Sequence, residues 1–153
     1  MIKLNDLLIS KDFRLYEFES PDTNEVKLDP ELVIRLQGLR DLINLPIIIN
    51  SGYRTEAHNK FIKGTQQSFH LYGKAADIYI SGYELQRLFE GCVYIGFRGV
   101  IVYETKGFIH VDCRVGSYVV APRDWKLKAL AKNFFKGLDG KSSRIKVQTE
   151  RLL

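Results

Sequence analysis

The chain has 153 residues, which is enough for one domain with a buried core and too few for two ordinary domains. Hydrophobic residues make up 45% of the chain and charged residues 27%, and this profile excludes a largely disordered protein. The 23 Lys and Arg residues exceed the 18 Asp and Glu residues and give a net charge of +5, which favours a polyanionic partner such as nucleic acid or an anionic cell-wall polymer without excluding an ordinary basic protein.

One domain is expected over residues 1–136, followed by a polar and basic tail over residues 137–153. No run approaches the length of a membrane-spanning helix, and polar or charged residues interrupt each short apolar run at the N-terminus, so no signal peptide is recognised. We therefore expect synthesis in a cytoplasm and no membrane partner. Cys92 and Cys113 lack the spacing of a thiolate zinc site and are expected to be small buried residues, with a single disulfide between them as the alternative.

The first half of the chain predicts two helices and a strand. An aspartate cap and a proline open a run of apolar residues at helical spacing, so a helix is predicted over residues 29–43. The β-branched run within residues 45–54 predicts a buried strand that delivers its last residues to a loop. Residues 55–62 predict a short helix.

The second half carries most of the expected strands. Residues 74–81 predict a strand, residues 82–92 an amphipathic helix, and residues 99–114 two strands joined by a turn at 105–107. A helix, or a loop and a helix, is expected over residues 122–135. With helices expected on one face of a small, mainly antiparallel sheet, the fold class is α+β rather than a regular alternation of strand and helix.

Three residues in the middle and second half of the chain are of the types that bind catalytic zinc. His70, Asp77 and His110 could supply the three protein ligands that such a site needs while leaving a fourth position open. Gly73 would let the backbone turn between the first two. The two-residue period of a strand places Asp112 on the same face as His110. Either histidine alone would more often be an ordinary loop or core residue, but the combined spacing favours a metal site.

These residues also carry a resemblance to a known family. The pattern S-x-H-x-x-G-x-A-x-D at residues 68–77, followed by H-x-D at 110–112, closely resembles the zinc D-alanyl-D-alanine carboxypeptidase family of peptidoglycan peptidases. The segments INSGYRTEAHN, GVIVYETKGFIHVDCR and KDFRLYEFESPDT are also similar to segments of that family. Together the similar segments cover most of residues 11–114.

The resemblance implies a Hedgehog/DD-peptidase-like fold with His70, Asp77 and His110 as zinc ligands. It also implies zinc-dependent hydrolysis of peptide bonds in peptidoglycan stem peptides or cross-links, through metal-activated water, by a D,D-carboxypeptidase or an endopeptidase. Arg54 matches a position that contacts the substrate in the family, and its planar guanidinium suits a carboxylate or a polarised carbonyl. The expected partner is a peptidoglycan peptide, with no nucleic acid, and the protein is expected to be a monomer.

The general base is the point where the sequence departs from the family. Gly107 stands three residues before the last histidine ligand, where many members carry an acidic residue. Asp112 is the first substitute because it shares the strand face of His110, although the same placement suits a carboxylate that orients a histidine ligand. Glu104 is the second substitute, and a water-mediated or absent base is the third option. A non-catalytic zinc-containing wall-binding or structural module is therefore the alternative to an enzyme.

The location of the protein follows from its expected substrate. A wall-directed peptidase that lacks an export signal needs release by cell lysis or carriage on a particle, so we expect a phage-type endolysin or a virion-associated enzyme. Trimming of peptides in the cytoplasm is the alternative. A nucleic-acid-binding domain is supported only by the net charge and the Tyr and Phe content, and no nucleic-acid-binding module is recognised.

Overall fold

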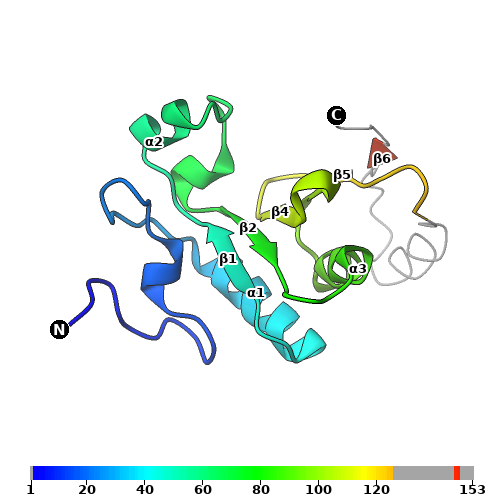
Figure 1. Cartoon of the computed structure of the whole chain (residues 1–153), viewed down its shortest axis with the longest axis horizontal. Helices are drawn as coiled ribbons and strands as arrows, with labels where there is room; N and C mark the ends of the chain where they lie inside the picture. The colour runs from blue at the N-terminus through cyan, green and yellow to red at the C-terminus, as the bar shows by residue number, and fades with distance from the viewer. Residues whose placement is uncertain (1, 126–146, 149–153) are drawn as a thin grey trace.

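A single six-stranded sheet organises the molecule. The structure is a computed structural model that describes residues 2–125 and 147–148 (Figure 1). The strand order is β1-β2-β4-β3-β5-β6. The strands are β1 (Ile48–Ser51), β2 (Ala75–Tyr79), β3 (Gly99–Tyr103), β4 (Phe108–Asp112), β5 (Tyr118–Val120) and β6 (Val147–Gln148). The first four strands in this spatial order pair antiparallel, whereas β5 pairs parallel with β3 and β6 parallel with β5. The predicted α+β fold with a mainly antiparallel sheet is confirmed.

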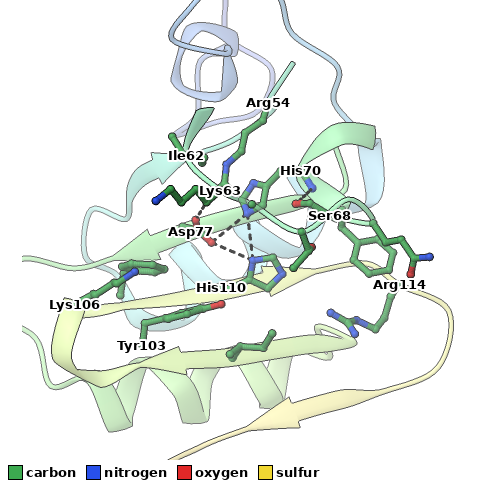
Figure 2. A pocket seen from close by; sticks show the side chains of 16 residues that line it. Arg54, Ile62, Lys63, Ser68, His70, Asp77, Tyr103, Lys106, His110 and Arg114 are labelled. Carbon is green, nitrogen blue, oxygen red and sulfur yellow. Dashed lines mark hydrogen bonds and ion pairs between the residues drawn. The ribbon is translucent and has the colours of Figure 1, made fainter. Parts of the chain in front are cut away.

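Helices and the sheet enclose one hydrophobic core. The described helices are α1 (Pro30–Ile43), α2 (Glu56–Phe61) and α3 (Leu85–Ile95), with short 3-10 turns η1 (Leu15–Phe18), η2 (Phe69–Tyr72) and η3 (Glu104–Lys106). Helices α1 and α3 pack on each other, and α3 packs on β3 and β4. Their buried leucines join the inward residues of β2, β3 and β4 in the core. Figure 2 shows α3 below the sheet and the cavity side chains above it.

Local sequence signals explain where the first helices begin. The Asp29 carboxylate accepts a hydrogen bond from the backbone N–H of Glu31 at 2.8 Å, and Pro30 occupies the first position of α1. Asn44, in the left-handed region with φ 58°, ends the same helix. The hydroxyl of Thr55 caps α2 in the same way as Asp29 caps α1. The predicted helices over 29–43 and 55–62 are therefore confirmed to within a residue at each end.

The predicted burial of the first strand is wrong. Strand β1 lies at the edge of the sheet formed by the described residues, where it pairs with β2 alone, and Ile48 is 37% exposed. Ile47, just before the strand, is the residue of the apolar run that is buried in the core. A run of β-branched residues thus forms an edge strand here rather than a buried one. The predicted strand at 74–81, the helix near 82–92 and the strand pair within 99–114 are confirmed as β2, α3, β3 and β4.

The C-terminal predictions fall partly outside the described residues. Residues 122–125 form a turn, and the rest of the helix expected over 122–135 lies outside the described part of the chain. Of the expected tail, only residues 147–148 are described, as β6. No helix among the described residues is long and apolar enough to cross a membrane.

The two cysteines are buried and free. This confirms the expectation of small buried residues over the alternative of a disulfide. Burial raises the pKa of the Cys92 thiol well above its ordinary value and that of Cys113 to about 12. Both thiols therefore stay protonated at neutral pH and act as small apolar side chains.

Candidate metal centre

Two strands and one 3-10 turn bring the predicted ligands together. His70 lies on η2, whereas Asp77 on β2 and His110 on β4 are directly opposite each other in the antiparallel pair. The Ser68 hydroxyl caps η2 by accepting a hydrogen bond from the backbone N–H of His70 at 3.3 Å. Gly73 ends η2 with φ 68°, and a Cβ there would lie 2.2 Å from the backbone oxygen of Lys27. Glycine is therefore required at this turn into β2.

Three side-chain atoms of these residues converge. His70 Nε2 lies 3.2 Å from Asp77 Oδ1 and 3.2 Å from His110 Nδ1, and His110 Nδ1 lies 3.0 Å from Asp77 Oδ1 (Figure 2). On the far side of each ring, His70 Nδ1 is 2.6 Å from the carbonyl oxygen of Gly52, and His110 Nε2 is 2.8 Å from Asp112 Oδ2. Each histidine thus uses a different ring nitrogen toward the cluster.

The hydrogen-bond partners decide what the cluster can hold. A carbonyl and a carboxylate accept hydrogen bonds, so each neutral imidazole carries its proton on the outer nitrogen and turns a lone pair inward. The inward atoms of His70, Asp77 and His110 are then three acceptors with no proton between them. Ligands about 2.0 to 2.1 Å from a tetrahedral zinc ion lie roughly 3.3 Å apart, close to the separations found here. The residues present therefore fit a zinc ion.

Burial and hydrogen bonding set the charges of the cluster. Burial lowers the pKa of His70 below its ordinary value. Burial opposes ionisation of Asp77, but when the inner nitrogen of His110 or His70 carries a proton, its hydrogen bond to Asp77 outweighs burial and holds the pKa of Asp77 well below its ordinary value. Burial also disfavours charge on His110, yet hydrogen bonds to Asp112 and Asp77 outweigh it and raise the pKa of His110. A proton and a metal ion therefore compete for this position.

Arg54 lies at the same centre. Its Nη2 donates to Asp77 Oδ2 at 2.7 Å, and its Nε donates to the hydroxyl of Ser51 at 2.9 Å. The side chain of Arg54 is 13% exposed. The Asp77 carboxylate is thus divided, with Oδ1 facing the histidines and Oδ2 held by Arg54.

A cavity of about 530 Å³ opens over the cluster. Its charged lining is mostly positive and comes from Arg54, Lys63, Lys106 and Arg114. Of the described residues that line it, Asp77 alone carries a carboxylate. Figure 2 shows Lys63 and Lys106 toward one end of the cavity and Arg114 toward the other. An anionic ligand suits such a cavity.

The two acids that were candidate bases lie outside this lining. Asp112 is 0% exposed, and both its oxygens are bound, by His110 and by Arg114. Glu104 is exposed at the start of η3 and does not line the cavity. Gly107 ends η3 in the left-handed region with φ 73°, a conformation in which any other side chain is strained. The structure thus brings His70, Asp77, His110 and Arg54 together and leaves Glu104 apart.

Several residues that line the cavity were not predicted as site residues from the sequence, among them Lys63, Tyr103, Lys106 and Arg114. Arg114 had a usable signal, because it continues the two-residue period of His110 and Asp112. Lys63 follows α2 in a left-handed conformation with φ 58°, in a loop that no periodic pattern marks.

Two histidines and a carboxylate beneath an open cavity are a ligand set that zinc hydrolases use. The family model of Peptidase M15 matches residues 12–112, and the chain belongs to this peptidase family. Its α+β fold is the fold expected for the family, and the resemblance drawn from the sequence motifs is confirmed.

A relative from Haemophilus influenzae gives a second comparison. The chain is 31% identical over 106 residues to a protein described as a probable peptidoglycan L,D-endopeptidase MepK. The matched region is 63% of this chain and 57% of that protein, so the chain spans less than two thirds of the relative's length.

Proposed function

We propose that this chain is a zinc-dependent peptidase that hydrolyses peptide bonds in peptidoglycan stem peptides or cross-links. The observation that supports it most directly is the convergence of His70 Nε2, Asp77 Oδ1 and His110 Nδ1 beneath an open cavity. These residues would hold a zinc ion, which would supply an electrophile for a peptide carbonyl and would activate water at neutral pH. The description of the Haemophilus relative supports peptidoglycan as the substrate.

Arg54 has two tasks in this proposal. It holds Asp77 Oδ2 and so leaves Oδ1 to face the histidines. Among the described residues, its side-chain hydrogen bonds are made by Nε and Nη2, which leaves Nη1 for a carbonyl or carboxylate of the substrate.

Tyr103 supplies a second donor. It lines the cavity from β3, and its ring stacks on Phe108 with the centroids 4.8 Å apart. Burial raises the pKa of Tyr103 above its ordinary value, so its hydroxyl stays protonated at neutral pH. Figure 2 shows this hydroxyl on the side of the ring that faces His110. We assign it as a hydrogen-bond donor to the peptide oxygen on which negative charge develops.

The positive lining supports an anionic peptide as the substrate. Arg54 and Arg114 already pair with carboxylates of the protein, whereas no ion pair of Lys63 or Lys106 is found within the described residues. Stem peptides are rich in carboxylates, and these two lysines can attract them into the cavity.

Asp112, the first candidate for the general base, is enclosed and has no access to the cavity. A fully buried carboxylate that is bound by His110 and Arg114 is poorly placed to take a proton from water in the cavity, so we propose that Asp112 orients His110. The acceptor is then Glu104 acting through water, or water alone. Variants of Asp112 and Glu104 separate these assignments.

Digestion of purified peptidoglycan tests the proposal. Wild-type protein, zinc-depleted protein, zinc-reconstituted protein and the His70→Ala variant are each incubated with it, and the products are read by mass spectrometry. New peptide termini are expected only with wild-type and reconstituted protein. Loss of a terminal D-alanine would identify a carboxypeptidase, and internal cleavage an endopeptidase. Binding of peptidoglycan by zinc-loaded protein without new termini would instead support a wall-binding module.

The route to the cell wall stays a prediction. Phage-type release or carriage on a virion would be supported by native protein found in lysates of infected cells or in particles. Native protein that is exported through a cleaved leader would contradict it.

A further inference from the structure

Arg114, which follows β4, holds the carboxylate of Asp112 with three hydrogen bonds. Its Nε donates to Asp112 Oδ1 at 2.8 Å, its Nη2 donates to Oδ2 at 2.5 Å, and its backbone N–H donates to Oδ1 at 3.1 Å. The same Oδ2 accepts from His110 Nε2 at 2.8 Å. These contacts form one chain from the guanidinium through the carboxylate to the imidazole.

Aromatic rings fix the guanidinium itself. The carbon at its centre lies 4.7 Å from the ring centroid of Phe69 and 4.9 Å from that of Tyr118, and the Arg114 side chain is 19% exposed. Phe69 on η2 directly precedes His70 in the sequence, and Tyr118 begins β5. The cation therefore joins the element that carries the first histidine to the strand face that carries the second.

The carboxylate has little room to move. Gly99 on β3 is the direct partner of Asp112 across the antiparallel pair, and a Cβ built on it would lie 2.1 Å from Asp112 Oδ2. Both carboxylate oxygens of Asp112 accept hydrogen bonds, Oδ1 from Arg114 and Oδ2 from Arg114 and His110. Asp112 is thus a hydrogen-bond acceptor in one fixed position.

We infer that Arg114 is a positioning residue of the metal centre, acting through Asp112 on His110. By holding Asp112 in place, it keeps the proton of His110 on Nε2 and the lone pair of Nδ1 directed at His70 and Asp77. The inference rests on the proposed zinc site and adds to it a residue beyond the region that matches the peptidase family, which ends at residue 112.

A double-mutant cycle on zinc affinity tests this inference. The dissociation constant for Zn²⁺ is measured by competition with a fluorescent chelator for wild type, Arg114→Met, Asp112→Asn and the double variant. Arg114→Met is expected to weaken binding about 10- to 100-fold, the range for partners of metal ligands. In the Asp112→Asn background the same change should cost less than about 2-fold, because its path to His110 is already cut.

Two further variants complete the design. Arg114→Lys keeps the charge without the two-pronged contact and should fall between wild type and Arg114→Met. Arg87→Met is the matched control, since Arg87 is 68% exposed on α3 and pairs with Glu84. It should bind zinc as wild type does. Thermal unfolding of each metal-free variant checks the fold, and Arg114→Lys carries the test if Arg114→Met does not fold.

The outcomes separate the inference from the proposed function. Wild-type protein that binds no zinc contradicts the metal site and the inference with it. Wild-type protein that binds zinc, with a folded Arg114→Met or Arg114→Lys of equal affinity, contradicts the inference alone. Equal costs of Arg114→Met with and without Asp112 also contradict it, because they indicate a structural role that does not pass through Asp112.

Discussion

Two arginine–aspartate pairs flank His110, and their carboxylates differ in access to the cavity. On the Nδ1 side, Asp77 pairs with Arg54 and both line the cavity; on the Nε2 side, Asp112 pairs with Arg114, and of these two only Arg114 lines it. The side chain of Asp77 is 6% exposed and that of Asp112 is 0% exposed. We therefore propose different tasks for the two carboxylates: Asp77 as a metal ligand and Asp112 as the residue that orients the ligand His110.

The largest expected effect comes from replacing Asp77, the carboxylate that lines the cavity. Asp77→Asn removes the charged ligand atom, so zinc affinity should fall by more than about 100-fold, the upper range for residues that only support a ligand. Turnover should fall to the background of His70→Ala. Isothermal titration with Zn²⁺ and product analysis measure the two effects, and zinc affinity equal to that of wild type would remove Asp77 from the ligand set.

Tyr103→Phe should lower turnover without weakening zinc binding, which distinguishes Tyr103 from the proposed metal ligands. Loss of one hydrogen-bond donor to a developing oxyanion lowers kcat by about 100-fold or more. The zinc affinity should change little, because no hydrogen bond joins Tyr103 to either pair among the described residues. A kcat within a few-fold of wild type would exclude the donor role of Tyr103.

Asp112→Asn makes the same substitution as Asp77→Asn, but on the opposite side of the His110 ring. It should keep the fold and weaken zinc binding about 10- to 100-fold, with turnover largely restored at saturating zinc. If Asp112 were instead the general base, kcat at saturating zinc would stay at least about 100-fold below wild type. Glu104→Gln run in parallel shows whether that residue accepts the proton.

Variants of Arg54 test whether the arginine that pairs with Asp77 also contacts the substrate. Arg54→Ala should lower kcat/KM by about 10-fold or more, because one donor of Arg54 is left for the substrate. Its effect on zinc affinity and unfolding should be smaller, and Arg54→Lys should recover only part of the turnover. An unchanged kcat/KM in Arg54→Ala rules out contact with the substrate.

The smallest effect is a shift in the pH dependence of zinc binding. The pKa of His110 is raised above its ordinary value of 6.5, so its proton competes with the metal up to and beyond that pH. Zinc affinity should rise with pH through the pKa of His110 and then level off. Asp112→Asn removes one partner of the protonated imidazole and should move this rise to lower pH. A rise at an unchanged pH would show that Asp112 does not act on His110.

Local signals were enough to predict most of the fold and the convergence of His70, Asp77 and His110. Caps, helical spacing and two-residue alternation located α1, α2 and the strand pair that carries His110. The spacing of His70 and Asp77 around Gly73 located the candidate cluster, because a tight turn and the pairing of β2 with β4 fix the positions of all three side chains. The edge position of β1 could not be predicted in this way, since it depends on which strands pair.

The rest of the site depends on contacts between distant segments. Whether Asp112 faces the cavity or is enclosed is decided by Gly99 and Arg114, and nothing in the spacing of His110 and Asp112 distinguishes the two cases. Likewise, the contact of Arg54 with Asp77 joins the residues after β1 to β2 across the sheet. Side-chain access is a property of the packed structure.

A crystal structure of the zinc-loaded protein, with anomalous data at the zinc edge, would show which residues bind the metal. We expect one strong peak bound by His70 Nε2, Asp77 Oδ1 and His110 Nδ1 at about 2.0 to 2.2 Å, with Asp112 still paired to Arg114 and away from the metal. A peak elsewhere, a metal bound by Asp112, or coordination through His110 Nε2 would contradict this expectation.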